Sequence, residues 1–482
     1  MTVQVGASLV LSGRMSKYFR PWQIDQTQLL PASVQDFVGE DHLARFVVAL
    51  VREQLDLKEI TGSYRSSLGQ PPFDPQMMVA LLLYGYCRGV YSSRRIAKAC
   101  RERVDFMSIV ALDPPDFRTV SDFRKRHLTA LSALFVQVLR LCEKAGLVKL
   151  GHVALDGTKI KANASKHKAM SYERMEKRAA ALEAEVARWL AAAEAADSAE
   201  DKQHGAHRTG EEMPDWVADK KKRAETIRRA KAELEAEAKA AAEARRKAEA
   251  VTEEQRHKDG GRKKPGRPAA PPSTEPAPKA QKNFTDPESC IMKTKDGFIQ
   301  GYNGQAAVDS TAQVIVAQDL DARPTDQHQL VPMIAAIRAN LGRNPTELSA
   351  DSGFSSEVNL AELEEQGIDA DIATGRAKHA VAGMTGDESV AGTADAAPPS
   401  PEQAAPTRVA AMRKKIADGG HESPYRLRKQ LPEPVFGQIK QARGFRQFLL
   451  RGVEKVRAEW AMICTAHNIL KLATGLTRAE VA

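Results

Sequence analysis

One segment in the middle of the chain limits where a hydrophobic core can form. Residues 171–250 hold 24 alanines and 35 charged residues in 80 positions. This composition forms helix readily but supplies few large apolar side chains, so it predicts long, solvated helices. We expect one or two such helices over 166–258, as an antiparallel hairpin with a break near 205–214. The core must therefore come from the residues on either side of this insertion.

The residues before the insertion carry helix signals. Asp74 followed by Pro75 is typical of a helix start, and apolar residues recur at helical spacing before Gly146. We interpret residues 17–147 as a helical domain of their own. The predicted helices cover 74–87, 92–103, 119–126 and 128–145.

Strand signals flank the insertion. The sequence VKLGHVALDG at 148–157 predicts a short buried strand that ends at Asp156 and runs into a polar turn. After a Pro-rich basic linker at 259–283, alternating apolar residues predict two strands joined by a turn near 309–310. A helix over 329–341 and a strand leading into Asp351 come next.

The rest of the chain is predicted to complete the same domain. Residues 380–407 are rich in Ala, Gly, Pro and Thr and predict a flexible loop, and 433–476 predicts helix. Strands and helices alternate from 148 onward once the insertion is set aside. The fold class we predict is therefore a mixed α/β core, made of 148–165 and 284–476.

Composition and charge narrow the function only slightly. The formal net charge is +9, which is compatible with a polyanionic partner. The five cysteines form no CxxC pair, which argues against a disulfide framework or zinc ribbon. The longest apolar stretch, 77–87, is shorter than the roughly 20 residues that a membrane helix needs. We expect a cytoplasmic protein with no membrane partner.

Three acidic residues stand out by their context. Asp156 follows the apolar run HVAL, Asp351 follows LSA, and Glu433 begins EPVFGQIK. Carboxylates held by a rigid sheet edge are good ligands for Mg²⁺ or Mn²⁺, and three of them would hold two ions. Taken singly, each acid is explained as well by a turn cap.

The surrounding sequence makes the combination more specific. The motifs ALDGTKIKANASK, LSADSGFSS and EPVFGQIKQARGFRQFLLRG occur in this order, together with GYNGQAAVDS and ATGR. With these motifs the chain resembles bacterial insertion-sequence transposases of the DDE class, in the branch with a ribonuclease H-like catalytic domain. The resemblance runs from 19 to 472 and matches Asp156, Asp351 and Glu433 to the catalytic triad of that family.

The resemblance implies a fold and an activity. It implies a ribonuclease H-like core with a helical N-terminal domain for DNA binding and dimerisation. It also implies two Mg²⁺ ions, with Mn²⁺ able to substitute, and DNA transposition through terminal inverted repeats. Expected partners are double-stranded repeat and target DNA and a homodimer or larger assembly, in a bacterial cytoplasm beside the nucleoid. Two alternatives stay open: an endonuclease of this fold that does not join strands, and a domesticated DNA-binding protein without catalysis.

A pattern of Tyr, Arg, Glu and Lys described for relatives extends the third motif. Tyr425 and Arg428 keep its first spacing, and Glu433 and Lys440 keep its last. Four residues separate Arg428 from Glu433 where the pattern has three. Residues seven apart share a helical face, so Glu433 and Lys440 are predicted to point at one DNA backbone. An exposed helix decorated with charges is the alternative.

Other basic residues are candidates for DNA contact. SSRRIAKACRE followed by PDFRTVSDFRKRH predicts a helix–turn–helix whose second helix reads the major groove. A basic helix with a solvated face is the alternative. An arginine between Gly and Pro in the linker suits a narrow minor groove, and a plain flexible linker with solubilising charge is the alternative. Lys159 and Asn163 follow Asp156 closely and are candidates for DNA contact or for support of the strand end, with solvated turn residues as the alternative. The predicted DNA-binding residues are Arg118, Ser121, Arg124, Lys125, Arg267, Arg428 and Lys440.

Overall fold

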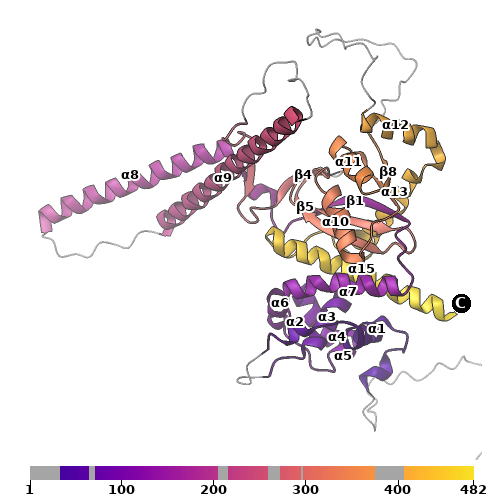
Figure 1. Ribbon diagram of the computed structural model, residues 1–482. Helices are drawn as coiled ribbons and strands as arrows, with labels where there is room; N and C mark the ends of the chain where they lie inside the picture. Colours follow the sequence, from indigo (N-terminus) through magenta and orange to yellow (C-terminus); the bar gives the residue numbers. More distant parts are fainter. Residues whose placement is uncertain are drawn as a thin grey trace, which may run out of the picture.

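The computed structural model places three parts of the chain side by side (Figure 1). These are a helical N-terminal domain, a mixed α/β domain and a projecting helical hairpin. The structure describes residues 33–64, 71–204, 215–258, 272–294, 297–374 and 407–481. The predicted loop at 380–407 and Arg267 in the linker lie outside these residues, except that residue 407 is described. No helix of the described part is both long and apolar enough to cross a membrane.

Within residues 33–64 and 71–147, the N-terminal domain contains helices and no strand. Its central helix α3 (Pro75–Cys87) starts at the N-cap Asp74, whose side chain accepts a hydrogen bond from the backbone N–H of Gln76, and it is buried over its whole apolar length. Around it lie η1 (Val34–Phe37), α1 (Leu43–Ala49), the π-helix η2 (Leu50–Gln54), α2 (Lys58–Thr61), α4 (Ser93–Glu102), α5 (Val104–Ile109), α6 (Phe117–Arg126) and α7 (Leu128–Lys144).

The predicted helix–turn–helix contains an additional helix. The chain is extended at Arg103 and then forms α5, which lies between α4 and α6 in sequence. Phe106 of α5 packs edge-on against Tyr84 of α3, with ring centroids 5.0 Å apart. Asp105 accepts a 2.5 Å hydrogen bond from the Tyr84 hydroxyl. The turn that the sequence indicated is therefore a buried helix anchored on α3.

A mixed sheet forms the core of the α/β domain. Strand β1 (His152–Lys161) pairs antiparallel with the long β5 (Gly297–Asp309) and parallel with β7 (Glu347–Ala350). β7 pairs in parallel with β8 (Asp369–Ile372), while β4 (Cys290–Thr294) and β6 (Ile315–Asp321) both pair antiparallel with β5. Parallel and antiparallel ladders therefore meet at β1, which confirms the mixed α/β class and is consistent with the fold of a DDE transposase.

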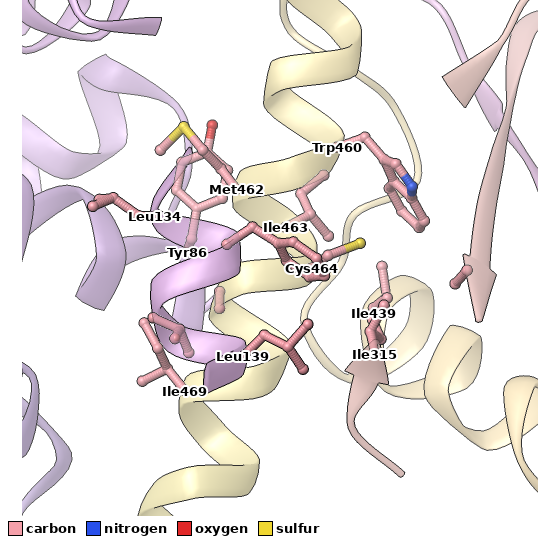
Figure 2. Packing of buried hydrophobic residues seen from close by; sticks show 14 of the residues in the cluster. Tyr86, Leu134, Leu139, Ile315, Ile439, Trp460, Met462, Ile463, Cys464 and Ile469 are labelled. Atoms are coloured by element: carbon pink, nitrogen blue, oxygen red, sulfur yellow. The ribbon is translucent and has the colours of Figure 1, made fainter. Parts of the chain in front are cut away.

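Helix α15 (Val453–Val481) joins this sheet to the N-terminal domain. It packs on β6 with one side and on α7 and α3 with another (Figure 2). Trp460 is fully buried and donates a 3.0 Å hydrogen bond to the backbone oxygen of Gln305 in β5. The Asn468 amide bonds both backbone groups of Ile315 in β6. Both domains therefore share one continuous apolar core.

Shorter helices complete the α/β domain. Two of them, α10 and α11, precede and follow β7 in sequence. The segment after Glu433, predicted as helix to 476, is broken between 443 and 452. The bounds are α10 (Leu330–Leu341), η4 (Ser352–Phe354), α11 (Glu357–Glu365), α12 (Arg408–Gly419), η5 (Gly420–Glu422), η6 (Pro424–Arg426), α13 (Leu427–Gln430), α14 (Pro432–Gly437) and the π-helix η7 (Gln438–Ala442).

The insertion forms two long helices, α8 (Tyr172–His204) and α9 (Asp215–Lys258). Lys220 pairs with Glu185 and Lys231 pairs with Glu176, so the two helices run in opposite directions. A small apolar core between them includes Leu182. At the base of the hairpin, β2 (Ala169–Ser171) pairs with β3 (Gln281–Asn283) after the short turn η3 (Lys166–Lys168), so the end of the predicted linker is a strand.

Candidate active site

The sheet brings two of the predicted acidic residues together. The parallel ladder between β1 and β7 ends with the pair Leu155 and Ala350. Asp156 and Asp351 are the next residues of each chain segment, so they lie side by side where this ladder stops. Asp156 is 14% exposed and Asp351 is 29% exposed.

The prediction that the first strand ends at Asp156 was wrong. On its other side β1 stays paired with β5 as far as Lys161, and Asp156 itself lies opposite Ala306. Only the parallel neighbour ends at Leu155. Asp156 is therefore held by a strand that continues beyond it, which limits its backbone freedom more than a turn would.

A single arginine lies between the two carboxylates. Nη2 of Arg428 in α13 is 3.9 Å from Oδ2 of Asp156 and 3.5 Å from Oδ2 of Asp351. Its Nε is buried and has no hydrogen-bond partner among the described residues. One guanidinium therefore faces two carboxylates, offsets part of their negative charge, and keeps a buried donor for a further acceptor, such as a phosphate oxygen.

Burial dominates the ionisation of Asp156. Desolvation raises the pKa of Asp156 to about 7, the Arg428 charge opposes this rise, and Asp351 adds to it. A carboxylate so placed gains from any additional cation brought next to it. Two aspartates with hard oxygen donors are also the ligand type that Mg²⁺ and Mn²⁺ prefer, so this pair fits a divalent ion.

A third carboxylate, which the sequence did not reveal, lies beside this pair. Asp326 follows β6 and precedes α10, and its Oδ1 accepts 2.6 Å hydrogen bonds from both Asn303 and Gln305 of β5. Burial raises the pKa of Asp326, and the charge of Asp351 contributes to this shift. An acidic residue between a strand and a helix was the available signal, but that context is common in loops.

Two glycines make room for the third carboxylate. A Cβ added to Gly157 would lie 2.5 Å from Oδ1 of Asp326. A Cβ added to Gly353 would lie 2.9 Å from Oδ1 of Asp351 and 3.3 Å from Oδ2 of Asp326. The residues after Asp156 and before Phe354 therefore have to be small for the acids to approach each other.

Lys440 and Glu433 occupy different surroundings. Nζ of Lys440 donates a 2.7 Å hydrogen bond to the backbone oxygen of Lys159, and burial lowers its pKa to about 8 against the opposing charge of Asp156. Glu433, by contrast, is exposed on α14. The helix widens into a π-helix from Gln438 onward, and the shared DNA-facing surface of Glu433 and Lys440 stays a prediction.

The acidic side chains predicted to bind metal do not surround one common ion position in the described part of the chain. Among the described residues, no three Asp, Glu, His or Cys side chains converge as ligands for one ion. Asp156, Asp351 and Asp326 cluster, while Glu433 lies outside the interactions found at the aspartates. The role of Glu433 therefore stays a prediction.

The predicted DNA-contact residues on α6 divide into two groups. Arg118 and Lys125 are exposed and Ser121 is half-buried. Arg124 is only 5% exposed and donates a 2.9 Å hydrogen bond to the backbone oxygen of Tyr91. This placement corrects the expectation that Arg124 faces DNA, because its guanidinium holds the helical domain together.

Comparison with known families adds two matches. Residues 32–126, which form most of the helical domain, match the family described as Transposase domain (DUF772). Residues 401–473, which include Arg428, Glu433 and Lys440, match the family described as Transposase DDE domain. No curated protein and no solved structure matches the chain. The two domains, on either side of the paired aspartates, support the assignment of this chain to the insertion-sequence transposases of the DDE class.

Proposed function

We propose that this protein binds the terminal inverted repeats of an insertion sequence, hydrolyses their 3′ ends and joins these ends to target DNA. The observation that carries the proposal is the pairing of Asp156 with Asp351 at the end of the parallel ladder, with Arg428 between them. In the sequence the two aspartates lie between two regions that match transposase families, and Arg428 lies within the second of these regions.

The residues would divide the work by their chemistry. Asp156, Asp351 and Glu433 would hold two divalent ions, with magnesium the expected metal and Asp326 close by. Bound there, such ions activate a water or a 3′-hydroxyl and stabilise the leaving oxygen of phosphoryl transfer. Arg428 and Lys440 would bind the phosphate being attacked. No covalent protein–DNA intermediate is required.

The test is a strand-cleavage and strand-transfer assay. The full chain is incubated with labelled duplexes that carry the inverted repeats flanking its gene, in Mg²⁺ or in EDTA. We expect nicked and joined products only with the metal. Cleavage without joining would support the endonuclease alternative, and specific binding without cleavage would support the domesticated DNA-binding protein.

Variants assign the roles. Asp156→Asn and Asp351→Asn should each reduce cleavage at least 10³-fold, as expected for loss of a group that stabilises the transition state. Glu365→Gln, a charge-matched change at an exposed residue of α11, is the control and should leave cleavage unchanged. Comparing Glu433→Gln with Asp326→Asn decides which acid completes the site. Wild-type activity in Asp156→Asn would overturn the assignment.

A further inference from the structure

A basic groove extends from the candidate active site. It encloses about 730 Å³ and reaches from Gly157, next to Asp156, along the second half of β1. The segment after η7 forms its other wall, because the backbone of Lys161 hydrogen-bonds to Arg446 and to Phe448. Of the described residues that line the groove, four are Lys or Arg and none is Asp or Glu. These four are Lys159, Lys161, Lys440 and Arg446.

Cations of the groove contact backbone oxygens, although Asp156 and Asp326 are near enough to interact electrostatically with Lys440 and Lys159. Nζ of Lys159 donates to the backbone oxygen of Lys293 at 3.0 Å, and Nε of Arg446 donates to that of Lys440 at 3.3 Å. None of the four cations forms an ion pair with another described residue. Several cations in a concave site that has no acidic residue among its described lining residues produce a positive potential that favours a polyanion.

An aromatic ring lies in the same groove. Phe298 is the second residue of β5, pairs opposite Lys293 of β4 and is 60% exposed. An exposed phenyl ring gains nothing from solvent, but it offers a flat face on which a base can stack. Cations along a groove together with an aromatic platform are the usual combination for binding a single nucleic-acid strand.

The volume of the groove and the exposed ring of Phe298 both favour binding of a single strand over binding of a duplex. Its volume is in the range of small-molecule sites, roughly 300–1,000 Å³, which suits a few nucleotides. Phe298 can stack only on a base whose face is free, and the bases of an intact duplex are covered by their neighbours.

We propose that this groove binds a single DNA strand that leads to Asp156, with Lys159, Lys161 and Arg446 contacting phosphates and Phe298 stacking on an unpaired base. The inference rests on the proposed function, since it describes how a DNA end reaches the paired aspartates. It adds that the DNA is locally opened beside the site of cleavage.

Binding is measured with the full chain in EDTA, so that no cleavage occurs. The probes are a dT oligonucleotide of 12 nucleotides, a duplex with a dT overhang and a blunt duplex, read by fluorescence anisotropy. Phe298→Ala should weaken binding of the first two about tenfold, as expected for loss of one stacked base, and leave the blunt duplex unchanged. Phe298→Trp should keep wild-type affinity.

Matched control variants separate the loss of base stacking or of charge in the groove from a general loss of folded protein. Phe117→Ala removes a partly exposed ring on α6 and should leave binding of the dT oligonucleotide unchanged. Lys161→Ala should lower the salt dependence of that binding by about 0.7 in the log–log slope, whereas Lys239→Ala on α9 should not. A 2-aminopurine placed in the overhang should lose fluorescence on wild type and regain it on Phe298→Ala.

Two results would overturn the proposal. The first is equal affinity of Phe298→Ala and Phe117→Ala for the dT oligonucleotide. The second is an equal loss by Phe298→Ala on the blunt duplex, which would make the groove a duplex contact. Because binding is read without metal, an inactive enzyme that passes these tests would refute the transposase proposal but leave the groove standing.

Discussion

Replacing Asp156 by asparagine should stabilise the protein while abolishing its activity. Burial raises the pKa of Asp156 from 3.8 to about 7, so the ionised side chain is disfavoured in the folded state. Each pKa unit corresponds to about 1.36 kcal/mol, which sets an upper limit of roughly 4 kcal/mol at alkaline pH. Because Asn is neutral and of equal size, we expect Asp156→Asn to raise the free energy of unfolding by about 2 kcal/mol, roughly half of this limit.

The size of this stabilisation depends on pH. A folded-state pKa above the unfolded value means that the folded protein binds the proton more tightly. The contribution of Asp156 to stability therefore falls as the pH rises from about 4 to about 7, and then stays constant. Asp156→Asn should melt roughly 5 °C above wild type at pH 8 in EDTA, with a much smaller difference at pH 4.

Metal and a second buried aspartate provide the controls. Mg²⁺ at ten times its dissociation constant should stabilise wild type by about 1.4 kcal/mol, and Asp156→Asn by less. Asp309 is fully buried, and it accepts backbone hydrogen bonds from Leu150 and Thr311. Asp309→Asn should therefore destabilise the fold. If Asp156→Asn melted at or below wild type at pH 8, or if its shift did not change with pH, the reasoning would be refuted.

Five further substitutions test other parts of the structure. Arg428→Ala should lower the melting temperature in EDTA, since breaking a partly buried ion pair costs roughly 3 kcal/mol, and Mg²⁺ should restore more stability to it than to wild type. Between pH 8 and 10.5 the folded protein has lost the Lys440 proton while the unfolded chain keeps it, so the stability of wild type should rise with pH. Lys440→Met should abolish this rise, as measured by melting curves across the range. Equal slopes of stability against pH in the variant and in wild type would contradict the prediction. Leu182→Ala should weaken the α8–α9 hairpin by about 2–4 kcal/mol and speed hydrogen exchange there alone. Arg124→Ala should lower the melting temperature, whereas Arg118→Ala should change only DNA affinity; the opposite result would mean that the two roles are reversed.

The candidate site was predictable where it depended on local sequence. Apolar runs before Asp156 and Asp351 indicated strands, and the motifs around them indicated their chemistry. Asp326 was not predictable in this way, because its position depends on how the connection from β6 to α10 folds back over β5. Its hydrogen bonds with Asn303 and Gln305 join residues more than 20 positions apart.

The helical regions show the same limit. Helix positions followed from caps and periodicity, as at Asp74 in front of α3. The burial of Arg124 did not follow, since a basic residue on a helix is exposed unless another element covers it. Here Tyr91 and Ser93 close over its guanidinium. The break between 443 and 452 also depends on tertiary contacts, because that segment pairs with the end of β1.

The sequence by itself indicated the fold class and the helical insertion, because composition and strand periodicity act over a few residues and do not depend on distant partners. It singled out the two aspartates through the resemblance of their motifs to a known family. Only the tertiary structure decided which charges meet. Register places Asp156 beside Asp351, and the fold adds Arg428 between them and Asp326 against their glycines. Ionisation and ligand binding depend on distances of a few ångströms between residues far apart in the chain, and those distances are set by packing.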